Sequence, residues 1–301
     1  MAVATSETDT TATTAQRPAS TASGRLVRAL TRAPLNVILI VVALLWLVPT
    51  FGLLVSSFRS ADANAASGWW TALTKPTELT VQPYQDLLDD PAMLSSLWNT
   101  VLITVPSALL VVIVGALAAY AFSWMRFRGR DAVFLVVVGL LVVPLQIALI
   151  PVARLYDLLG LFGTIPGVVL FHVAFGLPFA IFLLRNFFVG IPSELLEAAR
   201  MDGAGEWTVF WRVVLPLGIP AIASLLIFQF LWVWNDLLVA LVFAGGSTQP
   251  LTVTIREQLR SFGANIDVIA PAAFLQMIVP LIVFFAFQRY FVQGLLAGSQ
   301  R

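Results

Sequence analysis

The chain has 301 residues, of which 59% are hydrophobic and 11% are charged, and its mean hydropathy is +0.92. This composition excludes an ordinary soluble domain, in which charged residues make up about a quarter of the chain, and it indicates a membrane protein. Cysteine is absent and His172 is the only histidine, which excludes disulfide scaffolds, cysteine nucleophiles and Cys/His zinc sites. The net charge is only +1, and we expect no nucleic-acid partner.

The N-terminal stretch is rich in Thr, Ser and Ala without apolar periodicity, so residues 1–34 are predicted as a disordered tail followed by a short basic segment. A signal peptide is the alternative, because arginines precede the first apolar run and Ala63-Asn64-Ala65 resembles a cleavage site. The run from Leu35 to Val55 exceeds an h-region of about 7 to 15 residues. This length favours an uncleaved first helix.

Six windows without charged residues are each long enough for a helix to cross a bilayer core of about 30 Å. Backbone amides in lipid must be satisfied within their own segment, so we predict an all-α membrane domain with six transmembrane helices over residues 35–301. The windows are Leu35–Val55, Trp98–Phe122, Ala132–Val152, Ile165–Leu184, Leu217–Asn235 and Val268–Gln288.

The basic residues predict the orientation, because Lys and Arg concentrate in the cytoplasmic segments of membrane proteins. With the N-terminus inside, twelve of the 17 basic residues fall in inside segments and five in outside segments. Both termini are therefore predicted to be cytoplasmic, and residues 57–97 to form a large external loop. The inside set is Arg17, Arg25, Arg28, Arg32, Arg126, Arg128, Arg130, Arg185, Arg200, Arg212, Arg289 and Arg301, and the outside set is Arg59, Lys75, Arg154, Arg256 and Arg260.

Charged residues gather in the cytoplasmic loop 190–216, between the fourth and fifth windows. The segment SELLEAARM from Ser193 to Met201 is composed of good helix formers, with Ser193 as the predicted N-cap. Glu194 and Glu197 lie near its N-terminal end, where the helix dipole favours anions. Gly203 follows and is predicted to stop the helix in a left-handed conformation.

A second amphipathic segment follows the glycine, with aromatic and apolar residues at i, i+3, i+4 and i+7. These residues are Trp207, Phe210, Trp211 and Val214. Pro216 and Pro220 mark the start of the fifth window. Helix, glycine turn and amphipathic helix allow two interpretations, an interfacial connector between two spans or a docking element for another protein.

The same loop carries a specific string of residues. Glu197-Ala198-Ala199 is followed after three residues by Gly203, and after nine more by Val213-Val214-Leu215-Pro216. This string resembles the E-A-A-x3-G-x9-I-x-L-P signature of the integral-membrane permease subunits of bacterial ABC importers, with Val213 in the usual Ile position. The resemblance favours the docking interpretation.

The resemblance covers about Leu35 to Ser299 and is specific for the carbohydrate class of these permeases, the maltose-type inner-membrane subunit. The similar stretches are RFRGRD, RLYDLLGLFGTIPGVVL, WVWNDLL and FQRYFVQGLLAGS. A further stretch, QLRSFGANIDVIAPAAFLQM, is similar to α-glucoside-type permeases.

The resemblance implies a type I ABC importer permease fold in a bacterial cytoplasmic membrane, with a coupling helix seated in a groove of a separate ATPase. It implies four partners: an ATPase subunit dimer, a second permease subunit in a heterodimer, an extracytoplasmic solute-binding protein and a sugar. ATP and Mg²⁺ would be bound by the ATPase, so this chain needs no cofactor, and membrane lipid surrounds it. The implied docking residues are Glu197, Ala198, Ala199, Arg200, Asp202 and Gly203.

Polar side chains within spans are costly and indicate candidate functional positions. Four of them are predicted to share a depth of about 9 to 14 Å below the external surface, from a rise of about 1.5 Å per residue. They are Gln146, His172, Gln229 and Gln276. A second candidate cluster for the solute path combines aromatic and polar groups, Trp232, Trp234, Asn235 and Asp236. Hydrogen bonding between helices is the alternative role for the first set, and interfacial anchoring is the alternative for the tryptophans.

The leading function is thus a non-enzymatic permease subunit for a sugar or oligosaccharide. The same architecture for a polyol or glycerol phosphate is the alternative, and a freestanding channel or secondary carrier is a distant one that the docking signature disfavours. A P-loop ATPase is excluded, because no G-x-x-x-x-G-K-[ST] string is present and the only lysine, Lys75, is predicted to be external.

Overall fold

The computed structural model describes residues 22–262 and 265–297, with side chains described for 34–259 and 265–288. The chain divides into two compact units, Met1–Phe51 and Gly52–Arg301. Regular structure in the described ranges is helical, and extended segments pair only in two isolated bridges, Arg59 with Leu79 and Gly163 with Ala244. An all-α architecture is therefore confirmed.

Helix α1 (Ala22–Ser57) supplies the regular structure of the first unit. It begins well before Leu35 and includes the predicted basic entry segment. Good helix formers, including Arg25 and Arg28, continue the helix ahead of the apolar window. Residues 1–21, predicted as a disordered tail, lie outside the described residues.

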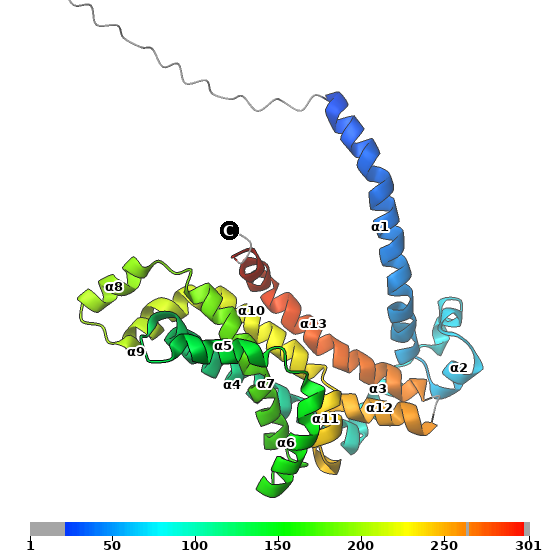
Figure 1. Ribbon diagram of the computed structural model, residues 1–301. Helices are drawn as coiled ribbons and strands as arrows, with labels where there is room; N and C mark the ends of the chain where they lie inside the picture. Colours follow the sequence, from blue (N-terminus) through cyan, green and yellow to red (C-terminus); the bar gives the residue numbers. More distant parts are fainter. Residues whose placement is uncertain (1–21, 263–264, 298–301) are drawn as a thin grey trace, which may run out of the picture. The chain divides into compact units, whose positions relative to one another are not determined.

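The second unit contains the other helices, and α8 and α9 lie at one end of it while α2, α3 and α12 lie at the opposite end (Figure 1). Three short elements are 3-10 helices and η3 is a π-helical turn. The elements are α2 (Ala61–Ala66), η1 (Trp69–Leu73), η2 (Pro76–Glu78), α3 (Gln82–Asp89), α4 (Pro91–Trp124), α5 (Arg130–Leu140), α6 (Leu145–Leu159), α7 (Ile165–Phe188), α8 (Ser193–Met201), α9 (Glu206–Val209), η3 (Phe210–Val214), α10 (Leu215–Trp234), α11 (Leu238–Phe243), η4 (Gly246–Thr248), α12 (Leu251–Phe262) and α13 (Ile266–Ala297).

Five helical runs in the described part of the chain are long and apolar enough to cross a membrane, and a bent pair makes a sixth. The third window, expected as one continuous helix, is instead the pair α5 and α6, which meet at 101°. Pro144 lies in extended geometry at the start of α6, and a proline disfavours helical geometry in the residue before it. The fifth span is longer than predicted, because α9, η3 and α10 run continuously from Glu206 to Trp234.

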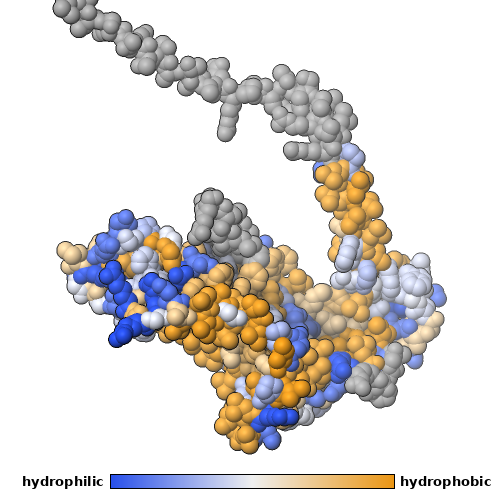
Figure 2. Space-filling view, in the orientation of Figure 1, coloured by the Kyte–Doolittle hydropathy of each residue, from blue (hydrophilic) through white to orange (hydrophobic). Residues whose placement is uncertain are grey.

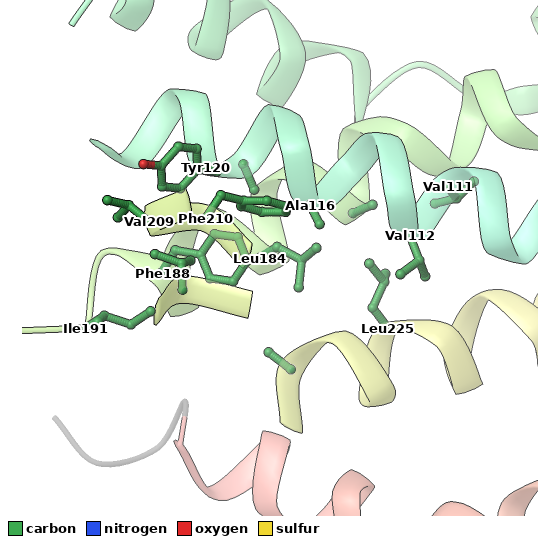
Figure 3. Packing of buried hydrophobic residues seen from close by; sticks show 14 of the residues in the cluster. Val111, Val112, Ala116, Tyr120, Leu184, Phe188, Ile191, Val209, Phe210 and Leu225 are labelled. Carbon is green, nitrogen blue, oxygen red and sulfur yellow. The ribbon is translucent and has the colours of Figure 1, made fainter. Parts of the chain in front are cut away.

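The core of the second unit lies where α4 packs along α7 and α10, and α10 also packs on α13. Small residues allow the close approach of α4 and α7: a Cβ added at Gly115 would lie 2.8 Å from the Cβ of Ala180. Toward the α8 end, Leu184, Phe188 and Leu225 join the cluster drawn in Figure 3. This packing holds the loop 190–216 against three spans.

The predicted external loop 57–97 is structured rather than irregular. It contains α2, η1, η2 and α3, and α4 begins within it at Pro91. Asp90 caps α4 by accepting from the Ala92 amide at 2.8 Å, and Pro91 suits the first helical turn. The apolar window beginning at Trp98 therefore missed the polar first turns of this helix.

Arg59 organises this external segment. Its side chain is fully buried and pairs with Glu78 at 2.8 Å, Nη2 to Oε2. The guanidinium also donates to the carbonyls of Ala63 (2.8 Å) and Ser67 (3.1 Å) and to the hydroxyl of Thr71 (3.1 Å). One buried cation thus ties α2, η1 and η2 together.

Candidate functional site

The loop 190–216 folds as its residue types predict. The predicted helix from Ser193 to Met201 coincides with α8. Pro192 occupies the N-cap position and makes no side-chain cap bond, so the prediction of Ser193 as N-cap is wrong by one residue. Glu194 lies in the first turn, where its negative charge interacts favourably with the positive end of the helix dipole.

The end of α8 is set by Gly203. This residue has φ +84°, the left-handed conformation predicted for it. The amide of Ala204 donates to the carbonyl of Ala199 at 3.0 Å, as in a Schellman motif, which closes the helix C-terminus. The chain then turns directly into α9 at Glu206. A short, defined turn therefore connects α8 to the fifth span.

One face of α8 packs against the spans through a single buried side chain, Leu196, which is fully buried in the cluster of Figure 3. Val209, Phe210 and Val214 from the following run belong to the same cluster. The predicted aromatic stripe is therefore divided, because Phe210 and Val214 enter the core while Trp207 and Trp211 remain exposed. The loop is fixed to the membrane helices rather than only connecting them.

The opposite face of α8 is exposed and acidic. Glu197, Ala198, Asp202 and Gly203 are exposed, and the Met201 side chain is 88% exposed. Figure 2 shows hydrophilic residues gathered at this end of the second unit, beside an apolar band over the spans. Ala199 is half-buried against the core cluster. Four of the six predicted docking residues are thus accessible on α8 and the turn that follows it.

Arg200, the remaining predicted docking residue, binds another residue of this chain. Its Nε donates to Glu206 Oε1 at 3.0 Å and its Nη2 to Glu206 Oε2 at 3.2 Å. The hydroxyl of Tyr120 also donates to Glu206 Oε2. These hydrogen bonds to Glu206 hold the pKa of the Arg200 guanidinium above its ordinary value. Sequence reasoning missed Tyr120 and Glu206, which carry no spacing signal because they lie far apart in the chain.

Within the spans, the structure brings three of the predicted path residues together. The His172 ring meets the Trp232 ring edge-on at 5.4 Å between centroids. Its Nε2 lies 3.7 Å from Asp236 Oδ2, which is beyond hydrogen-bond range. The amides of Val239 and Ala240 donate to the Asp236 carboxyl at 3.3 and 3.0 Å. An aromatic face, an imidazole and a carboxyl thus adjoin one another.

Other predicted path residues bond to backbone carbonyls. Gln276 and Trp234 exchange hydrogen bonds, Nε1 of Trp234 to the Gln276 carbonyl at 2.8 Å and Nε2 of Gln276 to the Trp234 carbonyl at 2.7 Å. Asn235 donates to the Leu231 carbonyl at 2.8 Å, and Gln146 is exposed on α6. Among the described residues, no hydrogen bond joins any two of Gln146, His172, Gln229 and Gln276. Hydrogen bonds therefore do not join these four residues into one polar layer, and their shared depth stays a prediction.

Several buried polar atoms in the core lack a hydrogen-bond partner in the described structure. They include Thr104 Oγ1, Ser107 Oγ, His172 Nδ1 and Gln229 Nε2. Gln229 packs at Gly176, where an added Cβ would lie 2.8 Å from its Nε2 and 2.9 Å from Val111 Cγ2. Ser107 lies one turn from Val111 on α4. The hydroxyls of Thr104 and Ser107 therefore belong to the face of α4 that lies near the Gln229 amide.

Thr104 and Ser107 were missed because a hydroxyl in a helix commonly bonds its own backbone. Their signal in the sequence is the recurrence of buried polar residues at three- and four-residue spacings along α4: Ser96, Asn99, Thr100, Thr104 and Ser107. In the described ranges, no group of three His, Asp or Glu side chains is placed to hold a metal ion.

Comparison with known proteins places these features in context. Residues 111–296 match the family described as "Binding-protein-dependent transport system inner membrane component". The chain is 46% identical over 273 residues to the osmoprotective compounds uptake permease protein GgtD of Synechocystis sp., which covers 89% of this chain and 92% of that protein. It is 37% identical over 364 residues to the α-glucoside transport system permease protein AglG of Rhizobium meliloti, which covers 88% and 95%.

A solved structure shares the fold. The match has a TM-score of 0.74 at 24% sequence identity and covers 91% of this chain and 100% of the other. That chain comes from the crystal structure of a bacterial ABC transporter involved in the import of the acidic polysaccharide alginate. The likeness confirms the type I importer permease fold expected from the sequence.

Proposed function

Because the chain belongs to the family of inner membrane components of binding-protein-dependent transport systems, we propose that it forms part of a sugar translocation path and couples it to a separate ATPase. It is a multi-pass permease subunit of a carbohydrate ABC importer, and it carries no catalytic activity of its own. The observation that carries the coupling role is α8, a short helix stopped by left-handed Gly203 and anchored on the spans by Leu196.

The exposed face of α8 sets the chemistry of the ATPase groove. Glu194, Glu197 and Asp202 are exposed there, while Arg200 is occupied by Glu206. Met201 projects from the same helix with an 88% exposed side chain. We infer a groove with basic residues at its rim and an apolar recess for the methionine, since charge-assisted bonds and a central apolar anchor give such interfaces their specificity. ATP and Mg²⁺ belong to that partner.

The solute proposed is a neutral sugar, and α-glucosides are the first class to test because AglG carries that name. His172, Gln229, Thr104 and Ser107 supply hydrogen-bonding groups without partners, and Trp232 supplies an aromatic face beside His172. The α4 and α10 helices contain no Lys or Arg, so a phosphate group would lack a cation at this position. This favours a sugar over glycerol phosphate.

The assembly proposed contains an ATPase dimer, a second permease subunit and an extracytoplasmic solute-binding protein. The orientation has both termini in the cytoplasm, supported by the distribution of basic residues. Cysteines introduced at Ala65 and at Ser193, both exposed, provide the test in this cysteine-free chain. An impermeant thiol reagent applied to intact cells should label the first and leave the second unlabelled; the reverse pattern would invert the orientation.

The solute path predicts an effect of replacing His172 or Gln229 with leucine. Each change removes polar atoms from the core, and one lost hydrogen bond to the solute corresponds to about a tenfold fall in uptake. Uptake of a labelled α-glucoside is measured in cells that lack the native chain and express each variant. Gln288→Leu, a similar change at an exposed position of α13, should transport normally. Normal uptake and affinity in both core variants would remove these residues from the path.

A further inference from the structure

A single carboxylate joins three elements at the cytoplasmic end of the second unit. Glu206, the first residue of α9, accepts two hydrogen bonds from Arg200 on α8, at 3.0 and 3.2 Å, and a third from the Tyr120 hydroxyl on α4. The α9 helix continues without a break into the fifth span. Glu206 therefore links the docking helix to two membrane helices at once.

The tyrosine is built into the core rather than resting on the surface. Tyr120 is 4% exposed, and its ring contacts the Phe210 ring at 5.3 Å between centroids. Figure 3 shows it among Val209, Phe210 and Phe188 at the end of the cluster. The phenol oxygen is the polar tip of an otherwise apolar contact. Packing of the ring therefore orients the Tyr120 hydroxyl toward Glu206.

The Arg200–Glu206 pair is suited to fixing a local geometry more than to stabilising the fold. The side chains of Arg200 and Glu206 are 35% and 43% exposed, and ion pairs this accessible contribute little to stability. Their geometry is nevertheless specific, because the guanidinium binds both carboxylate oxygens side-on. Without it, α8 would stay attached through buried Leu196 and half-buried Ala199 but would lose its side-chain link to α9 and, through Glu206, to Tyr120 of α4.

We propose that Tyr120, Glu206 and Arg200 form a transmission joint that passes the movement of α8 to α4 and α10. The proposal rests on the proposed docking of α8 to an ATPase. It assigns Arg200 to the interior of the permease rather than to the ATPase groove, and it makes Tyr120 and Glu206 positioning residues for coupling. Loss of the joint should leave docking intact and reduce the amount of sugar moved per ATP hydrolysed.

The test compares coupling with docking in the complete importer reconstituted in proteoliposomes. Tyr120→Phe removes one hydroxyl and keeps the ring in the core, and Glu206→Gln removes the charge. Both variants should co-purify with the ATPase at normal stoichiometry, while the ratio of sugar transported to ATP hydrolysed falls by about fivefold or more, the lower end of typical coupling between two sites. Tyr156→Phe, at a buried tyrosine of α6, is the matched control and should keep the normal ratio.

Charge reversal supplies a rescue test. Glu206→Arg alone should uncouple transport, and the double variant Arg200→Glu with Glu206→Arg should restore part of the ratio, because the pair is rebuilt with opposite polarity. A normal ratio in Tyr120→Phe and Glu206→Gln would overturn the proposal. Loss of ATPase co-purification in these variants would also overturn it, by placing the residues in the docking surface. The proposed docking of α8 is tested separately by Glu197→Lys. Normal co-purification of the ATPase with that variant would show that α8 does not dock the ATPase.

Discussion

Gly203→Val is expected to abolish productive docking of the ATPase while leaving the permease inserted in the membrane. Gly203 has φ +84°, and an added Cβ would meet no atom within 4 Å. The cost is therefore conformational rather than steric, about 1 to 2 kcal/mol for a left-handed L-residue. Relaxing that strain changes the turn between α8 and α9 and redirects the exposed face of α8.

The matched control for this change is Gly129→Val. Gly129 lies between α4 and α5, has φ +80°, and likewise has open space around an added Cβ. Its replacement introduces the same strain elsewhere and should leave co-purification of the ATPase unchanged. Gly203→Asn should rescue much of the effect, because asparagine tolerates the left-handed region. Equal losses in the two valine variants would indicate a general folding defect instead of a docking defect.

Glu197→Lys tests the same surface by charge. Glu197 is exposed on α8, so the reversal should not disturb the core, but it places a cation opposite the basic rim inferred for the ATPase groove. Co-purification of the ATPase and sugar-stimulated ATP hydrolysis should both fall, whereas membrane abundance stays normal. An interfacial connector without a docking role predicts near-normal values for both measurements.

Arg59→Met is expected to open the segment between α1 and α4, which is predicted to be external. The Arg59 side chain is fully buried and pairs with a Glu78 side chain that is 24% exposed. Removing it leaves Glu78 and the carbonyls of Ala63 and Ser67 without their cation. Loss of one partner from a buried pair costs about 3 kcal/mol or more, a large share of the stability of a local segment.

Limited proteolysis of the external segment in spheroplasts measures this effect. Proteinase K should cut the Arg59→Met protein within residues 58–80 much faster than the native chain. Lys75→Met makes the same change of charge at an exposed position of the same segment and should retain native protection. Equal protection of Arg59→Met and the native chain would show that Arg59 does not hold this segment together.

The predictions from sequence succeeded where a physical constraint acts locally. Uncharged windows must be helical in lipid, and α4, α7 and α13 each contain the predicted window. The α8 helix and its left-handed stop followed from residue types within one short segment, and both are confirmed. The resemblance to ABC importer permeases, carried by the same segment, and to their carbohydrate class, carried by other stretches, is confirmed by the family match and the relatives.

Other features depend on tertiary structure and could not be predicted in the same way. Proline in a span did not distinguish a break from a continuous helix, because Pro106 and Pro178 lie inside α4 and α7 whereas Pro144 lies at the 101° bend. The bond from Tyr120 to Glu206 joins residues 86 positions apart, which no local pattern encodes. The burial of Arg59 likewise depends on several elements that fold around it.

The depth argument for the solute path stays a prediction, because equal depth does not establish contact. Gln276 bonds with Trp234, and Gln146 lies exposed on the helix after the bend. His172, Trp232 and Asp236 adjoin one another, and Gln229 of α10 packs against α7 at Gly176. Helix rotation, which sequence depth ignores, decides which of these side chains meet.

Solute-stimulated ATP hydrolysis by the reconstituted importer tests the central claim most directly. The permease pair, the ATPase dimer and the solute-binding protein are assembled in proteoliposomes, and hydrolysis is measured with and without an α-glucoside. We expect no hydrolysis by this chain alone, and in the complete complex a hydrolysis rate that rises when the binding protein and sugar are present and that is accompanied by uptake of the sugar. Sugar uptake that persists without the ATPase dimer, or that leaves the hydrolysis rate unchanged in the complete complex, would contradict the account.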